Sequence, residues 1–419
     1  MTNHSPARAS RLRILFTRSA VAVVAAGFLL AGAAAQQPAN SSSAAFRRLS
    51  AQAIAARDAQ QLDQAVPLFR KALALNPAWT EGWWSLGTID YDANRYAEAA
   101  AAFQRVVRLA PKQGTARAML GLCEFELGRD KAALADIEAS KNLGVAQDPQ
   151  LRQVVLYHEG ELLRRAGKFH AAQLPLSSLC LEGVRSQDLV LTFGMAALRM
   201  RGAPPDPQSA AFETITFVGR GACLTAQKDF DHARDEFQSA IAKDPSNPSV
   251  YDAYGESRLD AHDLAGAVAA FQHEIALAPG SVLPRLRIAA ADYKVDSAAG
   301  LPYAEEAVRI APTLPFAHYL LGLLLVDTGA YARAIPHLEL AQKAFPTDAR
   351  IDLSLGSAYA QVGRPKDAAR ARAEFLRLTR EAQKTQIQSP DSNPGETAPI
   401  VVTDGAADGV EDGADQRPQ

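Results

Sequence analysis

The chain has 419 residues, a length typical of several domains or of a repeat array. Of its residues 48% are hydrophobic and 21% are charged, a composition typical of a folded soluble protein. Its formal net charge is −2, and the part between the two ends is close to neutral. Phosphate backbones require a basic surface, so composition and charge speak against nucleic acid as a partner.

The first 35 residues are predicted to be an export signal. Four arginines form a basic start, Ala20 to Leu30 is apolar, and Ala33 to Ala35 supplies a small-residue cleavage site. The apolar run is shorter than the roughly 20 residues that span a bilayer. We therefore expect an exported protein, periplasmic or secreted. An uncleaved N-terminal segment that anchors the chain in a membrane is the alternative.

After a predicted linker at 36–45, the sequence repeats with a period close to 34 residues. Each repeat ends in a phrase such as AFQRVVRLAP, which closes at Pro111. Upstream lies a second phrase with an aromatic residue and a Leu-Gly-like pair, as in WWSLG from Trp83 to Gly87. The prolines that recur at this spacing are Pro77, Pro111, Pro245, Pro279, Pro312 and Pro346.

Each repeat is predicted to be a pair of helices. Trp83, Gly87 and Asp90 recur at the spacing of one helical face, and Ala99 and Phe103 do so in a second helix. Between the helices stands a residue suited to a left-handed conformation, which ends the first helix. The proline then ends the second. The predicted turn residues are Asn94, Gly128, Gly167, Gly329 and Gly363.

This pattern resembles the tetratricopeptide repeat, whose signature is W-x2-L-G-x2-Y followed by Ala, Phe, Ala and Pro at fixed offsets. The best copy comprises Trp83, Leu86, Gly87, Ala99, Phe103 and Pro111. The resemblance implies an all-α fold, a right-handed α-α superhelical solenoid of about nine helical hairpins. It also implies that the first helix of each hairpin faces an inner, concave groove.

The repeats are predicted to form two arrays, with four units in residues 46–186 and five in 214–383. Residues 187–213 interrupt them with an apolar helix, Gln187 to Arg201, and a Pro-rich loop at 202–208. This loop either contacts a partner or is a packed spacer. Residues 384–419 are predicted to be a disordered acidic tail. The units are expected to start near Phe46, Thr80, Gly114, Gln153, Thr214, Pro248, Val282, Pro315 and Ala349.

The motifs of common catalytic sites are absent from the sequence. His158 is followed by Glu159 and Glu161 but not by the second histidine of H-E-x-x-H, and phosphate-loop and G-x-S-x-G motifs are also missing. No cysteine pair has the spacing of a metal site. We therefore predict a protein that is not an enzyme and has no catalytic residue, metal ligand or cofactor.

The resemblance places a second face of each first helix on the groove, and this face is predicted to bind a partner. Aromatic rings there offer a large contact area with few rotors to restrain. The alternative is that neighbouring helices cover the rings. The predicted groove residues are Trp84, Tyr91, Phe125, Tyr157, Glu161, Arg164, Tyr293, Phe316 and Tyr319.

The sequence thus predicts a non-catalytic protein–protein interaction scaffold of the cell envelope that binds a peptide or helical segment in its concave groove. Its partner is a protein or peptide of unspecified identity, and membrane contact occurs only through an uncleaved N-terminal signal. One alternative is an enzyme, or an enzyme's accessory subunit, in cell-wall or polysaccharide processing. The other is a structural spacer.

Overall fold

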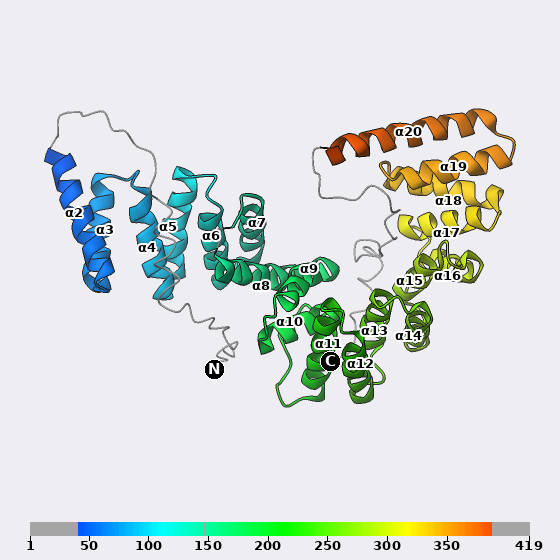
Figure 1. Ribbon diagram of the computed structural model, residues 1–419, viewed down its shortest axis with the longest axis horizontal. Coiled ribbons are helices and arrows are strands. Elements are labelled where there is room, and N and C mark those ends of the chain that lie inside the picture. Colours follow the sequence, from blue (N-terminus) through cyan, green and yellow to red (C-terminus); the bar gives the residue numbers. More distant parts are fainter. Residues whose placement is uncertain (1–40, 146–147, 388–419) are drawn as a thin grey trace, which may run out of the picture. The chain divides into compact units, whose positions relative to one another are not determined.

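The computed structural model describes residues 41–145 and 148–387. Within these ranges every regular element is an α-helix, and there is no strand. The predicted all-α helical solenoid is therefore confirmed (Figure 1). The predicted export signal and almost all of the predicted acidic tail lie outside the described residues.

The chain divides into two compact units. The first comprises residues 1–166 and 171–189, and the second comprises 167–170 and 190–419. The boundary between residues 189 and 190 falls inside the predicted interruption. The first unit holds α2 (Ser41–Asp58), α3 (Leu62–Leu75), α4 (Thr80–Asp92), α5 (Tyr96–Leu109), α6 (Gly114–Glu126), α7 (Asp130–Asn142), α8 (Pro149–Arg165) and most of α9 (Phe169–Leu181).

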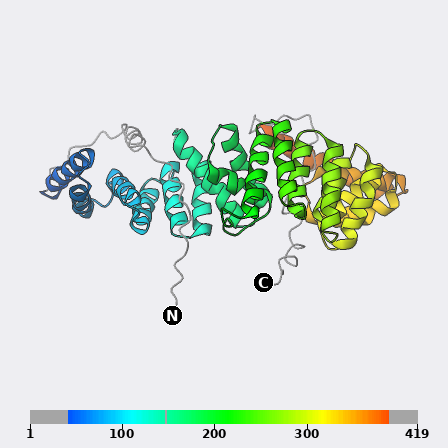
Figure 2. The same cartoon turned by 90° about the horizontal axis from the view of Figure 1, so that it is seen from below.

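The second unit holds most of the unpaired helix α10 (Gln187–Ala197) and five hairpins. In both views the two helices of a hairpin lie side by side (Figures 1 and 2). The paired helices are α11 (Ala210–Ala226) and α12 (Phe230–Lys243), α13 (Pro248–Asp260) and α14 (Leu264–Leu277), α15 (Leu283–Asp292) and α16 (Ser297–Ile310), α17 (Pro315–Asp327) and α18 (Tyr331–Ala344), and α19 (Ala349–Gln361) and α20 (Pro365–Ile387).

A residue with positive φ follows the first helix of every hairpin by two positions. The five predicted turn residues are confirmed, with φ between 57° and 79°. In the other four hairpins the same position holds a residue that the sequence did not mark, because neither Gly nor Asn occupies it. These residues are Gln60, Lys228, His262 and Lys294, with φ between 58° and 67°.

The six repeating prolines also act as predicted, since each stands two positions after the last residue of a second helix. Three of their carbonyls accept a hydrogen bond from a side chain six residues later. Trp83 donates Nε1–H to Pro77 over 2.8 Å, and Tyr251 donates its hydroxyl to Pro245 over 3.2 Å. His318 Nε2 lies 2.9 Å from the Pro312 carbonyl oxygen and must donate to it. These bonds tie a first helix to the connection that precedes it.

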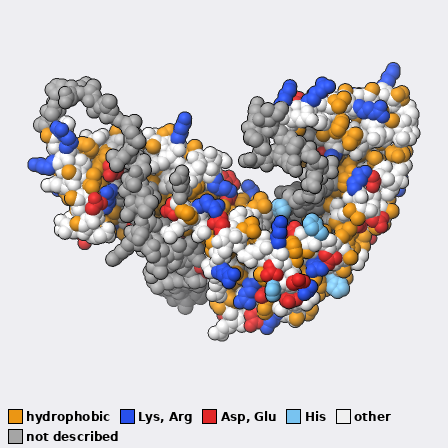
Figure 3. All heavy atoms as spheres, viewed as in Figure 1, with side chains coloured by type: hydrophobic (Ala, Val, Ile, Leu, Met, Phe, Trp, Pro, Cys, Tyr) orange, Lys and Arg blue, Asp and Glu red, His pale blue; other side chains and the backbone are white. Residues whose placement is uncertain are grey.

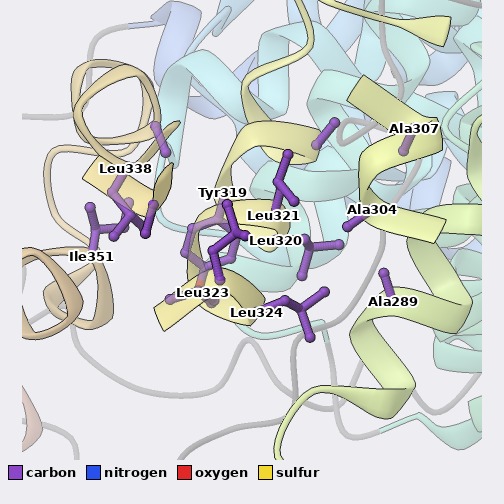
Figure 4. Close-up of a cluster of buried hydrophobic side chains, with 14 of the residues drawn as sticks. Ala289, Ala304, Ala307, Tyr319, Leu320, Leu321, Leu323, Leu324, Leu338 and Ile351 are labelled. Atoms are coloured by element: carbon purple, nitrogen blue, oxygen red, sulfur yellow. The ribbon is translucent and has the colours of Figure 1, made fainter. Parts of the chain in front are cut away.

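Neighbouring hairpins share their cores rather than burying apolar side chains alone. Figure 4 shows Leu320 and Leu324 of α17 between Ala304 of α16 on one side and Leu338 and Ile351 on the other. All five side chains are fully buried or nearly so. A 34-residue hairpin is too small to bury its own apolar faces, so stability depends on stacking.

First helices of successive hairpins contact one another directly: α6 with α8 in the first unit, and α11 with α13, α15 with α17, and α17 with α19 in the second. Second helices of successive hairpins do not approach to this extent anywhere in the described residues. At these four junctions the first helices therefore lie closer together than the second helices, on the inner side of the local curvature.

Several boundaries differ from the expected ones. The first helices α2, α8 and α11 begin four or five residues early, and α2 includes part of the predicted linker at 36–45. N-caps set two of these starts: Asp148 accepts the amide hydrogens of Gln150 and Leu151, and Ser209 accepts that of Phe212. Helix α10 ends at residue 197 instead of 201, before Arg199 with φ 56°, and α20 runs to residue 387, past the predicted start of the tail.

Candidate partner-binding surface

Six predicted groove residues lie on the first helices of the first unit, and the four aromatic ones among them are half-buried. Trp84 of α4 packs edge-on against Phe103, with ring centroids 5.4 Å apart. Tyr91, two turns further along α4, packs edge-on against Tyr96 at 5.5 Å. Burial, together with the negative charges of Glu126 and Asp92, raises the pKa of Tyr91, so its hydroxyl stays protonated. One part of each ring is fixed by the core and another reaches the surface.

Phe125 of α6 and Tyr157 of α8 are joined by His158, which was not among the predicted groove residues. His158 packs edge-on against Phe125 at 4.6 Å and against Tyr157 at 5.3 Å. Its Nδ1 donates to the Val154 carbonyl over 2.7 Å, and burial lowers its pKa, which favours the neutral ring at neutral pH. The Arg165 guanidinium lies 4.6 Å from the centre of the Phe125 ring. These three rings and the arginine form one aromatic surface across α6 and α8.

The structure corrects the predicted partner contacts of Glu161 and Arg164. The two residues are only 7% and 2% exposed, so a partner would find almost no surface on either. Arg164 donates two hydrogen bonds of 2.8 Å to Glu161, and Arg165 donates a third of 2.7 Å. Burial alone would raise the pKa of Glu161, but the two guanidinium groups outweigh it and lower the pKa. The pair stabilises the inside of the first unit.

A second correction concerns Tyr319 in the second unit, which is 2% exposed. Its hydroxyl donates to Asp348 Oδ2 over 3.0 Å, and the Arg350 guanidinium lies 5.7 Å from its ring centre. Both partners belong to the connection and first helix of the next hairpin, which cover the ring. Phe316 and Tyr293 remain half-buried and keep part of their predicted surface.

The second unit also contains a buried ion network. Arg287 of α15 forms ion pairs with Asp252 and Glu256 of α13, and Arg199 lies 3.7 Å from Asp252. Asp252 and Arg287 are 2% and 5% exposed. Asp252 and Glu256 occupy the same positions within their repeat as predicted groove residues do in other repeats. Their partner Arg287 lies one position away from such a position, so the repeat pattern does not single it out.

Residues 41–145 and 148–387 contain neither a metal-binding cluster nor a membrane-spanning helix. No group of three or more His, Cys, Asp or Glu side chains there is arranged to hold a metal ion. None of the helices in these ranges combines the length and the apolar character needed to span a membrane.

Stacked antiparallel hairpins with shared cores define this protein as a helical-repeat solenoid. Five stretches match the tetratricopeptide repeat family: 50–113, 85–150, 224–282, 289–349 and 319–383. Together they cover more than half of the chain, and the chain belongs to the tetratricopeptide repeat family. Proteins of this family generally use the fold for protein–protein interaction and not for catalysis. The repeats therefore support a role for this chain as a protein–protein interaction scaffold.

Several solved structures are similar to parts of this chain. MamA from Desulfovibrio magneticus RS-1, from residue 41 of that protein to its end, is 20% identical over 43% of this chain and 98% of that one, with a TM-score of 0.38. YrrB, described as a TPR protein with an unusual peptide-binding site, is 15% identical over 42% and 92%, with a TM-score of 0.36. The Cut9–Hcn1 complex of the APC/C is 14% identical over 80% and 87%, with a TM-score of 0.31. No curated protein matches the sequence.

Proposed function

We propose that this chain is a non-catalytic scaffold that binds an extended or helical segment of another protein along the first helices of its first unit. The observation that carries the proposal is the row of half-buried rings at Trp84, Tyr91, Phe125 and Tyr157. Each ring is held on one side by the core or by His158, so little side-chain entropy remains to be lost on binding.

The chemistry of this surface indicates the class of partner. Aromatic rings favour aliphatic and aromatic side chains, which gain affinity by leaving water. The guanidinium of Arg165 already pairs with Glu161 and Asp130, so it serves mainly to hold the Phe125 ring. We infer a segment with apolar residues at helical or extended spacing and few charges at its centre.

The proposal includes a location in the cell envelope, for which the support is the signal-like segment at residues 1–35. It also includes the absence of catalysis by this chain. The support is that helical hairpins of an interaction family occupy most of the described sequence. A partner that itself processes the cell wall is compatible with this proposal, because the chain then acts as the accessory subunit.

The proposal is tested by capture of partners from an envelope extract with the wild-type chain and with a Trp84→Ala, Tyr157→Ala double variant. We expect a specific protein to be lost from the variant. The same protein, once purified, should shift the tryptophan fluorescence of the wild-type chain. The matched control is a Leu174→Ala, Leu181→Ala double variant, because these leucines of α9 are 63% and 64% exposed.

The control should retain the partner. Equal recovery with both double variants, in chains whose circular dichroism matches the wild type, would show that the rings do not bind a partner. It would favour the structural-spacer alternative, for which the complete burial of Tyr319 by its neighbours is the supporting observation.

A further inference from the structure

The last hairpin exposes two leucines at positions that other hairpins cover. Leu353 of α19 is 48% exposed and Leu376 of α20 is 50% exposed. Leu353 stands 34 residues after Tyr319, which the next hairpin buries to 2%. The counterparts of Leu376 in earlier second helices are Ile241 and Ile275, and both are partly buried against clusters that include residues of the following hairpin. The side of α19 and α20 that a following hairpin would cover is therefore a stacking face, and no hairpin lies on it in the described residues. We call this side the outer face of α19 and α20.

This face is also basic. Residues 364–384 contain seven Lys and Arg but only three Asp and Glu. The three acids are already paired within the helix, Asp367 with Arg370 and both Glu374 and Glu381 with Arg377. A surplus of four positive charges remains, and Figure 3 shows Lys and Arg side chains along this edge of the second unit. The exposed members of the surplus are Lys366, Arg372, Arg380 and Lys384.

Charge decides between the candidate occupants. A second copy of the chain that stacked α20 on α20 would bring two basic helices together, which is unfavourable. The part of the chain beyond residue 387 has the opposite charge, with seven Asp and Glu against Arg417 alone. Its largest apolar cluster is Ile400, Val401 and Val402, which lies between Glu396 and Asp404. Apolar side chains flanked by acids match leucines flanked by arginines.

The connecting chain is long enough for this contact. The 12 residues 388–399 reach at most about 40 Å when fully extended. Leu376 lies 11 residues before Ile387 on α20, which corresponds to roughly 17 Å along a helix. The segment can therefore fold back over the middle of α20 with chain to spare.

We propose that residues 396–404 of the chain's own tail bind the outer face of α19 and α20. Ile400, Val401 and Val402 cover Leu353 and Leu376, and the flanking acids lie near Arg372 and Arg380. The tail thereby takes the place of a tenth hairpin and closes the C-terminal end of the array against other proteins. This inference is independent of the proposed partner-binding surface, which lies in the other unit.

The test is hydrogen–deuterium exchange of the full chain, read by mass spectrometry in peptides that cover residues 396–404 and 366–384. In the wild type at low salt, we expect exchange in 396–404 to be slower than in an unstructured peptide of the same sequence. Leu376→Glu should remove this protection, a change on the order of tenfold. The control is Leu277→Glu, on a leucine of α14 that is 42% exposed and should not affect the tail.

A second variant tests the contact from the other side. Replacing Ile400, Val401 and Val402 by Ser leaves the sequence of α20 unchanged and should speed exchange in residues 366–384. Addition of 0.5 M salt should have the same effect, because it shortens the Debye screening length to about 4 Å. Unprotected tail amides in the wild type would overturn the proposal. A dimer in sedimentation that Leu376→Glu dissociates, with the tail unprotected throughout, would overturn it in favour of a second copy.

Discussion

A Cβ atom added to Gly87 of α4 would lie 3.0 Å from Cε1 of Phe103 in α5, closer than nearly all such contacts. The two residues are 16 positions apart, and the relationship recurs along the array. In every case a glycine of the first helix meets a large side chain of the second. The glycine therefore sets how closely the two helices of a hairpin approach. The other pairs are Gly121–Ile137, Gly160–Leu176, Gly221–Phe237, Gly255–Phe271, Gly322–Leu338 and Gly356–Arg372.

Gly221→Ala is expected to destabilise the second unit. Alanine favours a helix by about 1 kcal/mol over glycine, but the new methyl group would lie 2.8 Å from the fully buried ring of Phe237. Overpacking of this kind costs about 1–3 kcal/mol, so the net effect should be a lower melting temperature in calorimetry. Gly202→Ala is the control, because nothing lies within 4 Å of its added Cβ. Equal melting temperatures for the two variants would contradict the close-approach argument.

Lys228→Gly is expected to stabilise the same unit. Lys228 has a φ of 62°. This left-handed conformation raises the free energy of a residue with a Cβ atom by roughly 1 kcal/mol, whereas glycine adopts it at almost no cost. Thermal unfolding should therefore occur at a higher temperature. Ala226→Gly, in the last position of α11, should instead lower it, since that residue is helical. If both glycine variants lower the melting temperature, the left-handed turn is not a source of strain.

Tyr251→Phe is expected to cost about 1 kcal/mol, the net value of one hydrogen bond, because the Pro245 carbonyl loses its donor. Tyr251 is 8% exposed, so water cannot readily replace the hydroxyl. Urea unfolding followed by circular dichroism measures the difference. The control is Tyr254→Phe, one helical turn further on, whose ring packs against Phe237 at 5.6 Å. A cost as large for Tyr254 as for Tyr251 would remove the special role of the proline carbonyl.

Glu161→Gln is expected to destabilise the first unit at pH 7 by about 3 kcal/mol, because it removes the buried carboxylate to which both Arg164 and Arg165 donate hydrogen bonds. The folded chain holds the pKa of Glu161 below its usual value. The stabilisation is therefore complete above the unfolded pKa, about 4.3, and is lost as the pH falls through the lower folded pKa. The urea unfolding free energies of wild type and variant should differ at pH 7 and begin to converge as the pH falls below about 4.

The control for this comparison is Glu138→Gln on the exposed side of α7, which should match the wild type at both pH values. A constant gap between wild type and Glu161→Gln across the pH range would mean that the charge of Glu161 does not contribute. The Glu161→Gln effect would then be one of packing.

The variants described above also allow the stability of each compact unit to be followed independently. Glu161 lies in the first unit, whereas Gly221, Lys228 and Tyr251 lie in the second. Each hairpin contacts mainly its neighbours, so a substitution acts chiefly on the hairpins next to it. Calorimetry of Glu161→Gln and Gly221→Ala should therefore perturb different parts of the unfolding transition.

The sequence by itself determined the hairpins. The spacing of Pro77 and Pro111, the glycine at position 87 and the turn residue Asn94 act within one repeat of 34 residues, so their consequences can be read from the order of residues. The turns at Lys228 and His262 escaped notice because their conformation is imposed by the packing of two helices and not by the residue type. Helix starts at α8 and α11 moved because Asp148 and Ser209 cap them upstream of the repeat phase.

Only the tertiary structure decided which residues of the inner helices remain accessible. Trp84 and Tyr319 occupy the same offset of the repeat, yet one is half-buried and the other fully buried. The difference comes from the following hairpin, where Asp348 and Arg350 reach back over Tyr319. Burial of a side chain depends on atoms from three neighbouring hairpins at once, whereas periodicity describes each hairpin alone. For this reason the fold follows from the repeat, and the accessible surface follows from how the repeats stack.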